Sequence, residues 1–269
     1  MTKRASGSKA RGRTSEASLE TRLAEACRIL AMEGQGDAVW GHATVRSPGA
    51  RTFLMKPAGL GLDEVQPDDL LVVDLEGRVV SGKRPRHSEV FIHSEIFKAR
   101  PEVGAVVHTH PVPSAVFASL GVPLRPITHE GANFVPPDVP RFSEITDLIV
   151  TPKRGEAVAR ALGDRSALFL VSHGIVAVGA TIEEAAVNAL LLDKAARAQL
   201  MLPGAEPRRW TTDEEALVKR QRIYHADNLA RRWAYLRRIL AQYEHGWPRG
   251  RAPDAATGGP ITPTTGRPA

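Results

Sequence analysis

The sequence is poor in cysteine and has no long apolar run. Cys27 is the only cysteine in 269 residues, so an internal disulfide is excluded. The apolar surroundings of Cys27 indicate a small core residue rather than a nucleophile. No run of about 18 apolar residues is present, so no membrane-spanning helix is expected. The basic N-terminus lacks the apolar stretch of a secretory signal, and we expect a cytoplasmic protein without membrane partners.

Acidic residues are scarce at the two ends of the chain. The first 15 positions carry five lysines and arginines and no acid, and the last 21 carry three arginines and one aspartate. The net charge of +6 therefore lies at the ends, around a nearly neutral body. This distribution does not favour nucleic acid as a partner. The Gly-, Ser-, Pro- and Thr-rich composition predicts disordered tails at 1–15 and 249–269 around a catalytic domain at 16–248.

The apolar pattern predicts helices alternating with strands. Helical spacing of apolar residues marks four segments: 17–32, 88–98, 155–162 and 182–202. In the second of these, Ser88 is a candidate N-cap and Glu89 then lies in the first turn. Short β-like runs occupy 43–46, 52–55, 70–75 and 78–80, and a charged and aromatic pattern over 212–243 predicts a last helix. We expect a single α/β domain.

Two further apolar runs, 103–108 and 167–173, are typical of buried strands, and both end in histidine. Because side chains alternate along a strand, His108 and His110 project from the same side. His173 ends the other run, before Gly174, where a tight backbone allows close approach. Three imidazoles with an open position suit Zn, Fe(II), Mn or Co. Histidines two apart also fit a hydrogen-bonded pair without metal, but His173 favours a metal site.

Five ordered segments carry a resemblance to a known family: 41–46, 68–77, 87–89, 100–110 and 172–174. With them the chain resembles the class II aldolase and adducin family over residues 19–199. The resemblance implies an α/β/α sandwich around a mainly antiparallel central sheet, in a homotetramer with active sites at subunit interfaces. It also implies one divalent metal ion per subunit, Fe²⁺, Zn²⁺ or Mn²⁺, bound by His108, His110 and His173. Glu89 would lie beside the ion as acid and base or as a ligand.

The chain departs from the family's sugar-phosphate aldolases at the phosphate-binding positions. Those aldolases hold phosphate with an Asn after Gly, a Ser-Gly pair and a Ser-Ser pair. The corresponding positions here are Gly41-His42, Ala58-Gly59 and His87-Ser88. Phosphate needs several converging donors, so we expect an unphosphorylated small-molecule carboxylic acid instead. The candidate substrate-binding residues are His42, Arg46, His87 and Ser88.

Within the family, the Gly-His motif, the segment 127–130 and the aromatic C-terminal helix resemble one branch. It contains the aromatic-acid decarboxylases and non-haem iron oxygenases of antibiotic biosynthesis, such as the aminocoumarin pathways of novobiocin and clorobiocin. The resemblance implies decarboxylation, oxidative or not, of a hydroxyaromatic or 2-oxo acid such as a prenylated 4-hydroxyphenylpyruvate. His129 and Glu130 could extend the pocket or cap a loop. The C-terminal aromatic residues could cover a neighbouring subunit's site or pack in the core.

Two other functions stay open at this point. A class II sugar aldolase or epimerase would use the same metal, and the missing phosphate donors oppose it. A non-catalytic, adducin-like binding module would keep the fold without metal, and the full set of three histidines and Glu89 opposes it.

Overall fold

The centre of the protein is an eight-stranded sheet in the order β4-β3-β2-β1-β5-β8-β7-β6. The computed structural model describes residues 17–49, 51–202 and 209–245. The predicted tails at 1–15 and 249–269 lie outside these residues. The strands are β1 (His42–Arg46), β2 (Thr52–Met55), β3 (Leu71–Asp74), β4 (Val79–Ser81), β5 (Ala105–Thr109), β6 (Arg141–Phe142), β7 (Ala167–Leu170) and β8 (Gly174–Gly179). All neighbouring strands pair antiparallel except β6 and β7, which confirms the predicted sheet.

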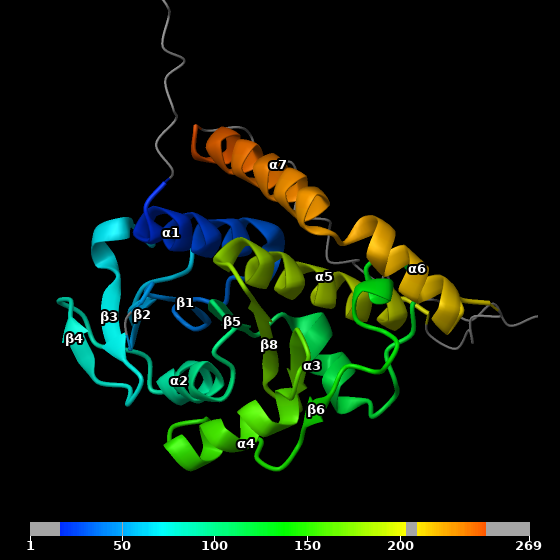
Figure 1. Ribbon diagram of the computed structural model, residues 1–269, viewed down its shortest axis with the longest axis horizontal. Helices are drawn as coiled ribbons and strands as arrows, with labels where there is room; N and C mark the ends of the chain where they lie inside the picture. The colour runs from blue at the N-terminus through cyan, green and yellow to red at the C-terminus, as the bar shows by residue number, and fades with distance from the viewer. Residues whose placement is uncertain (1–16, 50, 203–208, 246–269) are drawn as a thin grey trace, which may run out of the picture.

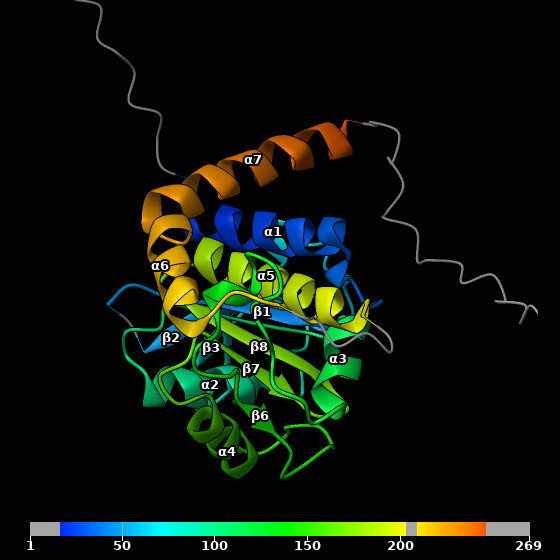
Figure 2. The ribbon, with the colours of Figure 1, turned by 90° about the vertical axis from the view of Figure 1, so that its right-hand side faces the viewer.

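Helices cover both faces of this sheet (Figures 1 and 2). One face is covered by α1 (Leu19–Leu30) and α5 (Ile182–Leu200), and α7 (Ala226–Glu244) packs on the outer side of these two helices. The opposite face is covered by α2 (Val90–Ala99) and α4 (Pro152–Leu162). The remaining helices are α3 (Val112–Ser119) and α6 (Asp213–Ile223). In the described part of the chain, no helix has the length and apolar character needed to cross a membrane.

Strand alternation creates one apolar core on each face of the sheet. In β5, Ala105 and Val107 belong to the core under α1 and α5, whereas Val106 belongs to the core over α2 and α4. His108 therefore shares the α2 face with Val106. The same alternation in β1 places Ala43 in the α1 core, so the even-numbered positions of β1 face α2. The polar side chains at one end of the sheet thus collect beneath α2.

Most predicted elements are present, with three differences. The helix predicted from Ser88 begins at Val90, and Glu89 occupies the N-cap position without a side-chain cap bond. The strand predicted to run to His173 ends at Leu170, and His173 lies in the turn before β8. The helix predicted over 212–243 is divided, because Tyr224 (φ −106°, ψ 31°) closes α6 and the next residue caps α7.

Candidate metal centre

Four side chains converge at the end of β5 where the chain leaves the sheet. His108 lies within β5 and His110 just beyond it, His173 comes from the β7–β8 turn, and Glu89 directly precedes α2. One ligand atom from each of the four lies within 4.8 Å of the others. The structure thus brings together the three histidines predicted as metal ligands, with Glu89 beside them.

The approach of the β7–β8 turn to β5 depends on a glycine. A Cβ built on Gly174 would lie 2.3 Å from the Thr109 carbonyl oxygen and 2.9 Å from Cδ2 of His110. Any other residue would push the turn away from the strand end. Gly174 therefore sets the separation between His173 and the pair His108 and His110.

Hydrogen bonds fix the orientation of two of the histidine rings. His108 Nδ1 lies 2.9 Å from the Ile175 carbonyl oxygen, and His110 Nδ1 lies 3.1 Å from Asp37 Oδ2. Both partners accept, so both Nδ1 atoms carry the hydrogen and both Nε2 atoms are left as lone pairs. These Nε2 atoms are 3.0 Å apart. Two lone pairs at that distance repel each other unless a cation neutralises them.

The donor set fits a divalent metal ion. Burial, followed by the nearby His108 and His173, lowers the pKa of His110 to about 4, so this ring is neutral at pH 7. Neutral imidazoles with free Nε2 atoms and a carboxylate are ligands that Zn²⁺, Fe²⁺ and Mn²⁺ accept. Asp37, which orients His110, was not among the residues predicted from the sequence.

Glu89 is held as a carboxylate. Its Oε1 accepts a hydrogen bond of 2.8 Å from the Ile149 amide, and its Oε2 lies 3.6 Å from Nε2 of both His108 and His173. Burial by itself would raise the pKa of Glu89, but the adjacent imidazoles of His108 and His173 hold it well below its usual range. An ionised oxygen therefore faces the point where the imidazoles converge.

Two further histidines, both predicted to bind substrate, border Glu89. His42 Nε2 lies 4.0 Å from Glu89 Oε2, and the His42 and His87 ring centroids are 4.4 Å apart. Burial lowers the pKa of His42 well below its usual value. Burial, and then the charge of Lys56, lowers the pKa of His87 to about 4. Two neutral imidazoles thus line the site next to the carboxylate.

Lys56 supports this arrangement and was not predicted. Its side chain is fully buried, and Nζ lies 3.0 Å from the Val39 carbonyl oxygen and 3.1 Å from His87 Nε2. Burial lowers the pKa of Lys56 to about 8. The ammonium group thus joins His87 to the loop that leads into β1.

The other two predicted substrate-binding residues differ in location. Ser88 is exposed next to Glu89. Arg46 is at the far end of β1, where its guanidinium donates to the carbonyls of Phe97 (2.7 Å), Val103 (3.0 Å) and Arg100 (3.2 Å). The structure does not bring Arg46 to the cluster, and its contacts tie β1 to the C-terminal end of α2.

The two features whose role was open both lie away from the cluster. Glu130 precedes a short helical turn at Gly131–Asn133, and His129 is exposed beside it. Trp233 of α7 is buried in the core under α1 and α5, and Tyr224 packs against the same core. Trp233 and Tyr224 thus pack in the core, whereas Tyr235 of α7 is 53% exposed and Glu130 makes no side-chain cap bond.

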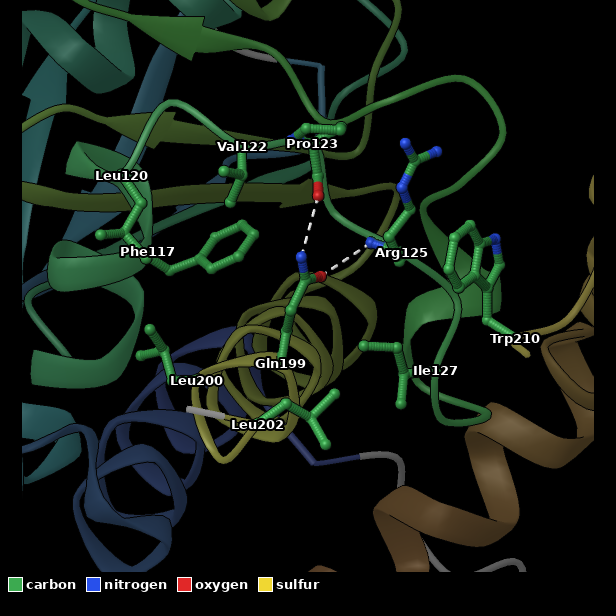
Figure 3. A pocket seen from close by; sticks show the side chains of 10 residues that line it. All are labelled: Phe117, Leu120, Val122, Pro123, Arg125, Ile127, Gln199, Leu200, Leu202 and Trp210. Atoms are coloured by element: carbon green, nitrogen blue, oxygen red, sulfur yellow. Dashed lines mark hydrogen bonds between the residues drawn. The ribbon is translucent and has the colours of Figure 1, made fainter. Parts of the chain in front are cut away.

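A pocket of about 300 Å³ lies where the C-terminal ends of α3 and α5 meet the segment 120–127 (Figure 3). Gln199 holds this segment, accepting from the Arg125 amide at 2.9 Å and donating to the Pro123 carbonyl at 3.1 Å. The ten residues that line the pocket include none of the four cluster residues. We assign no part of the chemistry to it.

Comparison with known proteins places this site in a family. The model of the Class II Aldolase and Adducin N-terminal domain matches residues 21–200. A 4-hydroxy-3-prenylphenylpyruvate oxygenase/4-hydroxy-3-prenylbenzoate synthase of Streptomyces roseochromogenus subsp. oscitans is 35% identical over 196 residues, which cover 70% of this chain and 70% of the relative. The 3,4-dihydroxyphthalate decarboxylase of Arthrobacter keyseri is 30% identical over 196 residues, which cover 68% and 78% respectively.

Among solved structures, the L-fuculose 1-phosphate aldolase from Glaciozyma antarctica PI12 superposes with a TM-score of 0.74 at 32% identity. The match covers 84% of this chain and 90% of that one. The sequence matches and the shared fold agree with the predicted family. The chain belongs to the class II aldolase and adducin family.

Proposed function

We propose that the protein is a metal-dependent enzyme that removes CO₂ from an unphosphorylated hydroxyaromatic or 2-oxo acid, such as a prenylated 4-hydroxyphenylpyruvate. The observation that carries the proposal is the placement of neutral His42 and His87 next to Glu89 and the three-histidine cluster. A sugar-phosphate aldolase would need phosphate donors at these positions. The relatives that are decarboxylases or oxygenases of aromatic acids support the same reading.

The surroundings of the site favour a substrate without phosphate. The Ala58 amide, at a position where aldolases bind phosphate, already donates to the Pro85 carbonyl at 2.9 Å. His42 and His87 each engage one ring nitrogen with another protein group. Few hydrogen-bond donors are left to converge on the three oxygens of a phosphate group. A carboxylate needs only two or three such donors. We assign substrate binding to His42, His87 and the exposed Ser88.

The chemistry requires negative charge to be held while a C–C bond breaks. His108, His110 and His173 would hold Fe²⁺, Zn²⁺ or Mn²⁺, and such an ion supplies a Lewis acid beside a substrate oxygen. Glu89 begins as a carboxylate and can accept the proton of a substrate hydroxyl. After CO₂ leaves a hydroxyaromatic acid, Glu89 can return this proton to the ring carbon that lost the carboxylate. A 2-oxo acid would lose CO₂ only with O₂ as the two-electron oxidant. His42 and His87 orient the substrate and help to exclude water.

A class II sugar aldolase or epimerase remains the second candidate, because the solved structure that superposes with a TM-score of 0.74 is a sugar-phosphate aldolase. It would use the same three histidines and Glu89. The two functions differ in the bond that breaks and in the product, so one assay separates them.

The test is turnover of the metal-loaded protein. Protein purified without oxygen and loaded with Fe²⁺, Zn²⁺ or Mn²⁺ is given 4-hydroxyphenylpyruvate, its 3-prenyl derivative or 3,4-dihydroxyphthalate, and CO₂ release and O₂ uptake are recorded. We expect CO₂ from at least one acid, with O₂ uptake only if the reaction is oxidative. L-fuculose 1-phosphate serves as the comparison substrate. Cleavage of the sugar phosphate without CO₂ release from any acid would reverse the assignment.

A further inference from the structure

A chain of three buried side chains leads into the site from behind His42. His42 Nδ1 lies 2.6 Å from His93 Nε2, and His93 Nδ1 lies 2.8 Å from the Thr44 hydroxyl oxygen. His93 and Thr44 are fully buried, and His42 is 2% exposed. Neither Thr44 nor His93 belongs to the metal cluster.

The direction of the hydrogen bonds depends on the single proton of the Thr44 hydroxyl. It has two possible acceptors, His93 Nδ1 at 2.8 Å and the Val106 carbonyl oxygen at 3.4 Å. Thr44 and Val106 are register partners in the antiparallel β1–β5 ladder. The Arg46 amide donates to the Gly104 carbonyl at 2.7 Å, and hydrogen-bonded pairs recur every second residue. In this ladder, the Val106 carbonyl therefore already accepts a hydrogen bond from the Thr44 amide.

The hydroxyl proton consequently belongs on the shorter contact, to His93. His93 Nδ1 is then the acceptor, and in a neutral ring the hydrogen lies on Nε2. His93 donates from Nε2 to His42 Nδ1, which leaves the His42 hydrogen on its own Nε2. This N–H faces the Glu89 carboxylate, whose Oε2 is 4.0 Å away, and the ionised carboxylate favours a donor over a lone pair at this point.

The series of hydrogen-bonded side chains ends at Thr44, because the Val106 carbonyl beyond its hydroxyl is not a base that can take up a proton. A proton entering at His42 would have no exit, so these residues do not form a proton relay. Their contacts instead fix the ring plane and the tautomer of His42, as partners behind metal-bound histidines do.

We propose that Thr44 and His93 are positioning residues that hold His42 as the Nε2–H tautomer, so that the site presents an N–H donor to an anionic oxygen of the substrate. The inference rests on the proposed function only in taking the substrate to be an acid. It explains why a histidine can occupy the position of an aldolase asparagine: the held ring offers one donor of fixed direction, which suits a carboxylate or a phenolate better than a phosphate.

The tautomer can be measured without turnover. In Zn²⁺-loaded protein labelled with ¹⁵N-histidine, long-range ¹H–¹⁵N correlation spectra report which nitrogen of each ring carries hydrogen, and His42→Gln and His93→Gln variants assign the signals. We expect the hydrogen on Nε2 in both His42 and His93. A His42 ring with its hydrogen on Nδ1 would overturn the proposal. The result is independent of whether the protein releases CO₂ from any acid, so the two proposals fail separately.

The matched variants are Thr44→Val, which removes the hydroxyl at nearly constant shape, and Thr44→Ser, which keeps it. We expect Thr44→Val to leave zinc content unchanged, to reduce the Nε2–H tautomer of His42 to about a tenth of the population, and therefore to weaken benzoate binding about tenfold. Thr44→Ser should behave as the wild type. No benzoate binding by the wild type, or equal binding and an unchanged His42 tautomer in Thr44→Val, would overturn the assignment.

Discussion

At the residue scale, the ring orientation and tautomer of the site's histidines are determined by the hydrogen-bond partners of their outer nitrogens. The Ile175 carbonyl and the Asp37 carboxylate turn the free nitrogens of His108 and His110 inward. His42 is held from behind by His93. Because a neutral imidazole presents either a hydrogen or a lone pair, these partners would decide which rings can bind a cation and which one can donate to an anion.

Glu89 allows a direct test of its role. Glu89→Gln keeps the shape of the side chain but can neither accept nor return a proton. We expect metal content to be unchanged, since three histidines suffice to hold the ion, and turnover to fall by roughly 10² to 10⁴. Glu102→Gln, at an exposed glutamate, is the control and should turn over normally. Loss of metal in Glu89→Gln would identify a ligand, and wild-type turnover would contradict both roles.

The cluster was predictable because His108, His110 and His173 follow apolar runs typical of strands, and Glu89 stands in a short motif before a helix. The sequence signal for His93 and Thr44 is weaker. His93 follows Glu89 by one helical turn, and Thr44 shares a strand face with His42. Neither spacing shows that α2 packs over β1. Asp37 and Lys56 reach the site from loops and neighbouring strands, and only the three-dimensional structure shows that they do.

At the scale of elements, the junction of β1 and α2 depends on Arg46. Its guanidinium donates hydrogen bonds to the Phe97 and Arg100 carbonyls at the end of α2. It also lies 4.6 Å from the centre of the Phe97 ring. Arg46→Met removes the guanidinium donor of the Phe97 carbonyl, while the Arg100 carbonyl still accepts from the Val103 amide at 3.1 Å. We expect the free energy of unfolding to fall by about 2 kcal/mol.

Urea unfolding measures this loss, and metal analysis checks the site. Metal content of Arg46→Met should stay at the wild-type level, because the arginine lies at the opposite end of β1 from His42. Arg51→Met, at a side chain that is 83% exposed, is the matched control and should change stability by less than about 0.5 kcal/mol. A loss of metal or of substrate binding with normal stability would return Arg46 to the site, as the sequence suggested.

The elements that the sequence did not predict are short or lack periodicity. β8 reads Gly-Ile-Val-Ala-Val-Gly, and its terminal glycines resemble a loop although it pairs with both β5 and β7. α3 begins two residues after His110 and has only 8 residues. The long helices and the central strands were predictable because their apolar spacing extends over several turns or a whole buried strand.

At the scale of the whole molecule, α3 carries an apolar stripe that nothing within the described chain covers. Val112, Val116 and Leu120 follow one another at intervals of one helical turn and are 72%, 47% and 54% exposed. The homotetramer predicted from the family would cover such a surface next to the site, because α3 begins just after His110. We expect light scattering to give a mass of about four chains.

The double substitution Val112→Glu and Val116→Glu tests this surface, because two buried charges oppose association. The variant should fold and dissociate into smaller species. Leu217→Glu, at a residue of α6 that is 45% exposed, is the control and should remain assembled. A wild type that is monomeric at micromolar concentration would contradict the predicted assembly.

Buried neutral histidines make the stability of the fold depend on pH. The pKa of His87 is about 4 in the folded protein and about 6.5 when unfolded, so the unfolded chain binds more protons between these values. Stability should therefore fall as the pH is lowered from about 6.5 to 4. His87→Gln should reduce this slope by up to about 1.4 kcal/mol per pH unit. Urea unfolding at pH 7, 6 and 5 measures it, with His225→Gln as the exposed control; identical slopes would contradict the effect.

His108, His110 and His173 are predicted to form a metal site, and the metal content of the purified protein tests this site directly. Wild-type protein prepared without oxygen and without added chelator is compared by elemental analysis with His108→Ala and His173→Ala prepared in parallel. We predict about one divalent ion per chain in the wild type and almost none in either variant, because two imidazoles compete poorly with water. Full metal content in a folded variant, or a wild type that binds no divalent ion, would contradict the account.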